Sequence, residues 1–268
     1  MDGIDDRGKP ISGNPSAEDK KNDHAATNAR REELHDSNST ARKLRILCLH
    51  GFRTNGRIME QQIATAKWAP LMDDIAELVF LNAPLPAVMR FPLEEKYGGP
   101  FFEWFRHSKS FAKVDHMESS IAYLADFVTV NGPFDGLLGF SQGGIFSGAL
   151  MGFYANGIGP KILDQFKFLI VVGGGRFLNN SLRDAYSQTI KCPSLHLIGD
   201  IDFMKLFGEA LMTGCEDPVV IRHPYGHLIP RLSASQGQIV REFLLKQLQF
   251  KFPSHEGNDP MIKIASPL

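Results

Sequence analysis

Ser141 lies in the sequence Gly139-Phe140-Ser141-Gln142-Gly143, the G-x-S-x-G pattern that carries the nucleophile of many hydrolases. An apolar run precedes this pattern and a helix-like run follows it, which predicts a strand, a tight turn and a helix. The glycines two residues before and two after the serine allow the chain to turn sharply. A serine at a helix N-terminus is also well placed for chemistry that develops negative charge.

A serine hydroxyl is a poor nucleophile without a base, so the pattern requires a histidine that is oriented by a carboxylate. Two later strand-like runs are followed by loops that offer such groups, Asp200 and Asp202 in the first and His223 and His227 in the second. We prefer Asp202, because Asp200 directly follows the end of its strand and can cap a loop amide. We prefer His227, because it follows a glycine in a loop that can reach the serine, whereas His223 continues its strand. The order Ser, Asp, His is the one expected for an α/β-hydrolase.

Acyl transfer also requires two N–H donors for the oxyanion. The expected donors are the backbone amides of Gln142, directly after the serine, and Phe52, in the loop after the first strand-like run. His50 ends that run, and we interpret it as a histidine that bonds loop carbonyls rather than as a base. Residues 84–114 form a long connection rich in Pro, Gly and aromatic residues, which predicts a packed surface loop that contributes to a pocket. The residues predicted to line the substrate pocket are His50, Phe102, Trp104 and Phe105.

A metal site is the competing chemistry. The residues that could in principle be ligands are His50, His196, His223, His227, Asp200 and Asp202. Neither H-E-x-x-H nor a Cys pair with metal spacing is present, so we expect no metal and no cofactor. G-x-G-x-x-G is also absent, and the glycines at 173–175 are interpreted as a turn beside the sheet. Cys48, Cys192 and Cys215 are far apart and are predicted to be reduced, structural thiols.

The composition is that of an ordinary globular protein, with 43% hydrophobic and 22% charged residues and a formal net charge of −1 over 268 residues. This charge balance gives no reason to expect a nucleic-acid partner. No apolar run approaches the roughly 20 residues that span a bilayer, and no secretory signal is evident. We therefore expect a cytoplasmic protein without a membrane span; a nuclear location is compatible, and acidic residues near the N-terminus argue against an organelle address.

Short β-rich runs alternate with longer amphipathic runs from Lys43 onward, which predicts a parallel sheet with helices on both faces. The expected strands are Leu44–Leu49, Glu77–Leu81, Asp135–Gly139, Phe168–Val172, Ser194–Gly199 and Val219–Arg222. The expected helices are Ile58–Lys67, His116–Val130, Gly143–Tyr154, Phe203–Met212 and Ala234–Leu248. Residues 1–41 are predicted to be a disordered polar leader, 42–252 the single domain and 253–268 a polar tail.

Four segments, LRILCLHGFRTNG, FDGLLGFSQGG, PSLHLIGDIDFM and HPYGHLIP, together resemble the FSH-type family of small serine hydrolases. The resemblance runs from about Leu44 to Phe250. It implies an α/β-hydrolase fold, a three-layer sandwich trimmed here to about six mainly parallel strands. It also implies a catalytic triad of Ser141, Asp202 and His227, in agreement with the choices made from the residues, and it places the segment around Trp104 near the pocket.

Two functions follow from these patterns. The first is hydrolysis of a small-molecule carboxylic ester or thioester by a Ser-His-Asp triad through an acyl-enzyme. The alternative is a small-molecule receptor built on a hydrolase scaffold, with little turnover. Specificity depends on pocket shape rather than on the triad, so neither the physiological substrate nor the oligomeric state follows from these residues.

Overall fold

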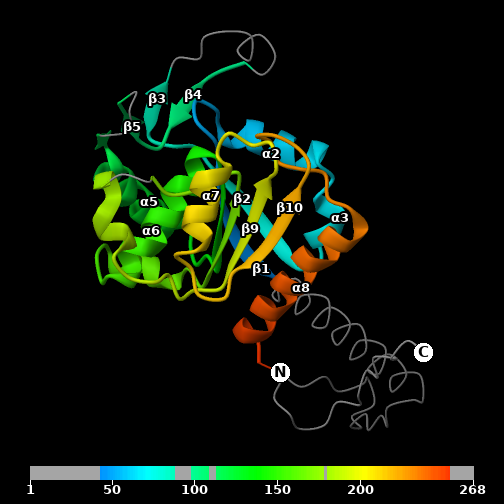
Figure 1. The fold of residues 1–268 in the computed structure, drawn as a ribbon. Helices are drawn as coiled ribbons and strands as arrows, with labels where there is room; N and C mark the ends of the chain where they lie inside the picture. Colours follow the sequence, from blue (N-terminus) through cyan, green and yellow to red (C-terminus); the bar gives the residue numbers. More distant parts are fainter. Residues whose placement is uncertain (1–42, 88–97, 109–112, 178–179, 254–268) are drawn as a thin grey trace, which may run out of the picture. The chain divides into compact units, whose positions relative to one another are not determined.

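The computed structural model describes residues 43–87, 98–108, 113–177 and 180–253. Its centre is a six-stranded sheet in the order β10-β9-β8-β7-β1-β2 (Figure 1). Every neighbouring pair in this sheet is parallel, which confirms the prediction of about six mainly parallel strands. The predicted leader and most of the predicted tail lie outside the described residues.

The strands of the sheet are β1 (Leu44–Leu49), β2 (Ala76–Leu81), β7 (Gly136–Phe140), β8 (Phe168–Val172), β9 (Ser194–Gly199) and β10 (Val219–His223). The α-helices are α2 (Gly56–Thr65), α3 (Ala69–Met72), α5 (Met117–Asn131), α6 (Gln142–Ala155), α7 (Lys205–Met212) and α8 (Ala234–Lys251). The short helix α3 was not expected, and α8 continues past the predicted Leu248. No helix in the described ranges combines the length and the apolarity needed to cross a membrane.

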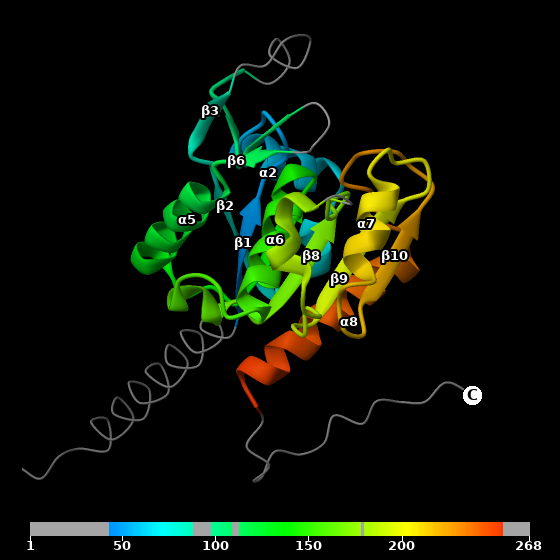
Figure 2. The same ribbon diagram turned by 60° about the vertical axis from the view of Figure 1, so that its left-hand side comes forward.

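Helices cover both faces of the sheet (Figure 2), and the alternation of side chains along the strands divides the core into two layers, one on each face. In β1, Leu47 and Leu49 belong to a cluster that includes residues of α5, α6 and α7. Ile46 and Cys48 point the other way, into a cluster that includes residues of α2, α3 and α8. The inner strands are therefore buried on both faces, which explains why their sequences are almost continuously apolar.

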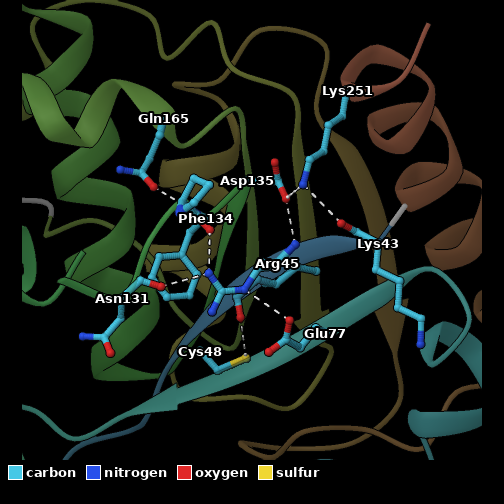
Figure 3. A network of polar contacts seen from close by, with 11 residues as sticks. Lys43, Arg45, Cys48, Glu77, Asn131, Phe134, Asp135, Gln165 and Lys251 are labelled. Atoms are coloured by element: carbon cyan, nitrogen blue, oxygen red, sulfur yellow. Dashed lines mark hydrogen bonds and ion pairs between the residues drawn. The ribbon is translucent and has the colours of Figure 1, made fainter. Parts of the chain in front are cut away.

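A network of polar contacts ties the amino-terminal edge of the sheet together (Figure 3). Asp135 accepts hydrogen bonds from the backbone N–H of Arg45 and from Lys251 Nζ, both at 2.7 Å. Arg45 also pairs with Glu77 on the neighbouring strand at 3.2 Å. These contacts join β1, β2, the entry to β7 and the end of α8 at the edge opposite to the functional groups described below.

The long connection at residues 84–114 differs from the prediction. Its described parts form two short antiparallel pairs, β3 (Leu85–Ala87) with β4 (Phe101–Glu103) and β5 (Arg106–His107) with β6 (Val114–Asp115). The prediction of a surface loop is wrong for Trp104 and Phe105, which are fully buried. Residues 88–97 and 109–112 lie outside the description.

Three histidines, His50, His196 and His223, are buried in or beside the central sheet. Burial lowers the pKa of His50 to about 4 and that of His196 to about 4, and it also lowers the pKa of His223. His196 also has a buried Nδ1 with no hydrogen-bond partner among the described residues. Since an exposed histidine titrates at about 6.5, the unfolded chain binds more protons than the folded chain between about pH 6.5 and pH 4. The stability that these neutral histidines contribute is present above pH 6.5 and is lost as the pH falls toward 4.

We expect His196→Leu to reduce the acid sensitivity of the fold. The variant removes one of the protons that the buried histidines take up on acid unfolding, so the fall in the free energy of unfolding between pH 7 and pH 4 should shrink by up to about 3 kcal/mol. Urea denaturation of both proteins at a series of pH values measures this difference. An equally steep fall in the variant would show that His196 does not contribute.

Candidate active site

The groups singled out from the sequence follow different strands and meet at one edge of the sheet. Phe52 follows β1, Ser141 follows β7, Asp202 follows β9 and His227 follows β10. Because all six strands are parallel, their carboxyl ends lie at the same edge, where open α/β sheets bind their ligands. The fold therefore brings together side chains that are far apart in the sequence.

Ser141 occupies a strained turn between β7 and α6, with φ 54° and ψ −116°. The small neighbours of the turn are required by close backbone contacts. A Cβ at Gly143 would overlap the carbonyl oxygen of Leu49, and a Cβ at Gly139 would overlap that of Gly143. The turn thus has the strand-turn-helix geometry expected of a nucleophile. Gly143 is needed for packing against the end of β1, and Gly139 for packing against the start of α6.

Gly143→Ala is expected to lower the free energy of unfolding by about 3 kcal/mol, because rigid backbone opposes the added methyl group. Gly148→Ala is the matched control on the same helix. Its Cβ would lie 2.7 Å from Leu211 Cδ2, the end of a side chain that can rotate away. We therefore expect a change within about 1 kcal/mol for the control, measured by urea denaturation. Equal effects of the two substitutions would contradict this account of the turn.

Three side chains form a continuous line of hydrogen bonds. His227 Nε2 lies 2.8 Å from Ser141 Oγ. On the other side of the ring, His227 Nδ1 lies 2.9 Å and 3.0 Å from the two carboxylate oxygens of Asp202. A carboxylate can only accept hydrogen bonds, so His227 Nδ1 carries the ring proton and donates it to Asp202 in a hydrogen bond. His227 Nε2 is then free to accept a hydrogen bond from the Ser141 hydroxyl. This is the arrangement that activates a serine in acyl transfer.

The structure distinguishes between the two candidates in each loop. The side chain of Asp202 is 2% exposed and also accepts a hydrogen bond from the N–H of Met204 at 2.8 Å. The side chain of Asp200 is 49% exposed and lies 4.0 Å from Lys205 Nζ. His223 is buried, neither of its ring nitrogens has a partner among the described residues, and burial lowers its pKa. Asp202 and His227, rather than Asp200 and His223, are therefore the residues that lie in line with Ser141.

Aromatic rings on both sides hold the His227 imidazole. The Phe140 ring stacks on it with centroids 5.2 Å apart, and the Phe203 ring lies at 4.4 Å. Gly173 has φ 54°, and a Cβ there would lie 3.1 Å from Asp202 Oδ2 and 3.3 Å from His227 Nδ1. These contacts restrict the ring and shield its bond to Asp202 from water.

The loop after β1 is fixed by the neutral His50 ring. His50 Nδ1 donates to the carbonyl of Gly51 at 2.8 Å, and Nε2 accepts from the N–H of Ala83 at 3.0 Å. Thr54 Oγ1 donates to the same carbonyl at 2.8 Å. The predicted role of His50, bonding loop carbonyls, agrees with this geometry. The ring holds the loop that carries the Phe52 amide, one of the two predicted oxyanion donors.

Gln142 connects the turn to the segment around Trp104. Its side-chain oxygen accepts from the N–H of Trp104 and its side-chain nitrogen donates to the carbonyl of Phe105, both at 2.8 Å. The indole N–H of Trp104 in turn donates to the carbonyl of His50 at 2.9 Å. As the first residue of α6, Gln142 has a backbone N–H without an acceptor inside the helix. One buried network therefore links the two predicted oxyanion donors.

A groove of about 650 Å³ opens beside Ser141. Its apolar lining includes Phe52, Phe140, Phe203, Leu228 and Ile229, and its polar lining includes Gln61, Gln62, Thr65 and Arg231. The predicted pocket residues His50, Phe102, Trp104 and Phe105 are not among its lining. His50, Trp104 and Phe105 are fully buried behind the turn, and Phe102 is held in the β3–β4 pair. The lining of this groove does not include these four residues, and their role in a substrate pocket stays a prediction.

Some residues of the site were missed. Phe203 lies in the loop of Asp202, and Arg231 lies in the loop of His227. Both residues are far from Ser141 in the sequence, and no sequence pattern indicated that they line the same groove as Ser141. Gly173 could have been found, because it follows a buried strand at the same edge of the sheet.

Within the described ranges, no group of three or more His, Cys, Asp and Glu side chains is arranged to hold a metal ion. All three cysteines are free thiols, and burial raises the pKa of Cys48 and Cys215.

A family model described as serine hydrolase (FSH1) matches residues 39–239. The chain is 31% identical over 224 residues to the esterase OVCA2 of Xenopus tropicalis. This match covers 77% of this chain and 94% of the Xenopus protein. The chain is 29% identical over 225 residues to the esterase CG5412 of Drosophila melanogaster, and this match covers 80% of this chain and 77% of the Drosophila protein.

Among solved structures, the acyl-protein thioesterase 2 of Zea mays superimposes with a TM-score of 0.56 at 20% sequence identity. The match covers 77% of this chain and 94% of the maize protein. At this level of identity the match establishes the fold, and it confirms the predicted α/β-hydrolase architecture.

Proposed function

The chain belongs to the serine hydrolase (FSH1) family, and from this premise we propose that it hydrolyses a carboxylic ester or thioester through an acyl-enzyme on Ser141. The observation that carries the proposal is the line from Ser141 Oγ to His227 Nε2 at 2.8 Å and from His227 Nδ1 to Asp202 at 2.9 Å. The serine has its base, and the base has its carboxylate, before any substrate binds.

In the first half of the reaction, Ser141 Oγ attacks the carbonyl carbon while His227 Nε2 takes the hydroxyl proton. Asp202 stabilises the imidazolium that forms. The backbone N–H groups of Gln142 and Phe52 receive the oxyanion, and each such donor typically contributes about 10²- to 10³-fold to the rate. His227 then returns the proton to the departing alcohol or thiol, and the acyl group remains on Ser141.

In the second half, water takes the place of the alcohol. His227 removes a proton from the water as it attacks the acyl-enzyme, the oxyanion forms again at the same two amides, and the proton passes to Ser141 Oγ as the acid is released. Esters and thioesters require the same groups. Relatives named as esterases and a structural neighbour named as a thioesterase are compatible with either substrate.

The number of turnovers separates this proposal from a receptor with a hydrolase scaffold. We expect the purified protein to release many equivalents of 4-nitrophenol per molecule from simple aryl esters, because His227 is positioned to activate water as well as serine. Stopped-flow absorbance records the first turnover, and a steady-state measurement records the turnovers that follow. Release of one equivalent that then stops would favour a receptor that reacts once.

A further inference from the structure

The groove beside Ser141 contains one formal charge. Besides His227, Arg231 is the only acidic or basic side chain among the lining residues of this groove, and it lies on the loop that also carries His227. Arg231 is exposed, and within the described part of the chain it forms no ion pair or hydrogen bond. The nearby carboxylate of Asp202 does not offset this charge at the groove surface, since its side chain is 2% exposed and bonded to His227.

A second polar group lines the groove without a partner. Gln62 Oε1 is buried and has no hydrogen-bond partner among the described residues. Buried polar atoms are nearly always paired, because an unpaired one carries the full cost of its lost hydration. Gln62 comes from α2 and Arg231 from the loop before α8, so two separate elements place an unpaired polar side chain beside the groove of the reactive serine. This pattern is typical of a site that orients a polar ligand.

We propose that the groove binds esters that carry an anionic group, a carboxylate or a phosphate, and that Arg231 is the residue that recognises this group. The guanidinium forms two parallel hydrogen bonds with either anion. Gln62 Oε1 can only accept a hydrogen bond, so it suits a donor elsewhere on the substrate rather than the anion. The apolar residues of the groove surround the rest of the substrate. This inference rests on the proposed function, because it names the substrate class of the same site.

The first test compares pairs of aryl esters that match in length and differ in charge, such as the 4-nitrophenyl monoesters of dicarboxylic acids and the corresponding simple acyl esters. We expect the wild type to prefer the anionic member of a pair in kcat/KM. Arg231→Gln should reduce that preference by about three- to ten-fold, because it should lower kcat/KM more for the anionic ester than for the neutral one. The preference should also weaken as the ionic strength rises.

Lys205→Gln is the matched control. Lys205 is a partly exposed cation beside the loop of Asp202, outside the lining of the groove, and its loss changes the net charge by the same amount. We expect this variant to keep the preference for the anionic ester. A second series with the anion on the alcohol, as carboxylate or as phosphate, shows which part of the substrate Arg231 contacts and which anion it favours.

A binding measurement makes the inference independent of turnover. In the Ser141→Ala background, which cannot form the acyl-enzyme, isothermal calorimetry measures binding of the intact anionic and neutral esters. Tighter binding of the anionic esters that is lost with Arg231→Gln supports the inference even if hydrolysis is not observed. Equal binding of both classes, or equal losses for both on Arg231→Gln, overturns it and leaves the proposed hydrolysis intact.

Discussion

Replacing Ser141 with alanine is expected to lower kcat for ester hydrolysis by about 10⁴-fold or more. Among Ser141, His227 and Asp202, only the serine hydroxyl can form the acyl-enzyme. In the variant, His227 Nε2 would lose the hydroxyl that lies 2.8 Å away in the wild type. Residual rate would come from the oxyanion donors and from binding alone. Steady-state kinetics on an aryl ester, with the unfolding temperature measured alongside, gives the comparison.

Ser147→Ala is the control for this experiment. Ser147 is a buried serine on the same helix, and its hydroxyl donates to the carbonyl of Gly144 at 3.2 Å, away from the line of three. Its loss should cost about 1 kcal/mol of stability or less and leave kcat within a few-fold of wild type. Comparable losses of rate in both variants would mean that the effect comes from packing of α6 rather than from the nucleophile.

The second large effect concerns the carboxylate. Asp202→Asn is expected to lower kcat by about 10³- to 10⁴-fold, because an amide no longer fixes the proton on His227 Nδ1 or stabilises the imidazolium. Asp200→Asn, two residues away, should change kcat by less than about three-fold, since its exposed side chain lies 4.0 Å from Lys205 Nζ and makes only a weak surface pair.

The measurement for this pair is kcat as a function of pH. Asp202 fixes the proton on His227 Nδ1 and leaves Nε2 free to act as a base, so Asp202→Asn should lower kcat far more than Asp200→Asn across the pH series. Loss of activity in Asp200→Asn equal to that in Asp202→Asn would assign the role to the loop as a whole.

The line of three could be predicted because strand order and chain order constrain it. A serine between a buried strand and a helix implies a parallel sheet, and in such a sheet the later loops must return to the same edge. Asp202 and His227 were preferred over their neighbours from their positions in those loops, and the hydrogen bonds agree with this choice.

The pocket could not be predicted in the same way. Trp104 and Phe105 were predicted to be pocket residues because aromatic residues in a long connection often line a pocket. Both are buried and are hydrogen-bonded through their backbones to the Gln142 side chain. Nothing in the local sequence indicates this tertiary contact. Phe203 and Arg231 reach the groove through the path of loops after β9 and β10. Side-chain direction in such loops is set by tertiary packing and leaves no periodic pattern.

The fold shows the same division. The six strands and the long helices follow from the alternation of short apolar runs with longer amphipathic runs, and their predicted bounds are close to those observed. The β3–β4 and β5–β6 pairs were missed because each is only two or three residues long, too short for a period to emerge. Short elements of this kind are stabilised by the core they cover rather than by their own sequence.

The central claim is that Ser141 is the nucleophile, and covalent labelling tests it most directly. The protein is treated with a fluorophosphonate, digested, and the modified peptide is identified by mass spectrometry. We predict one adduct, on Ser141, that is absent from Ser141→Ala and retained in Ser147→Ala. No adduct on the folded wild type, or equal labelling of Ser141→Ala, would contradict the claim.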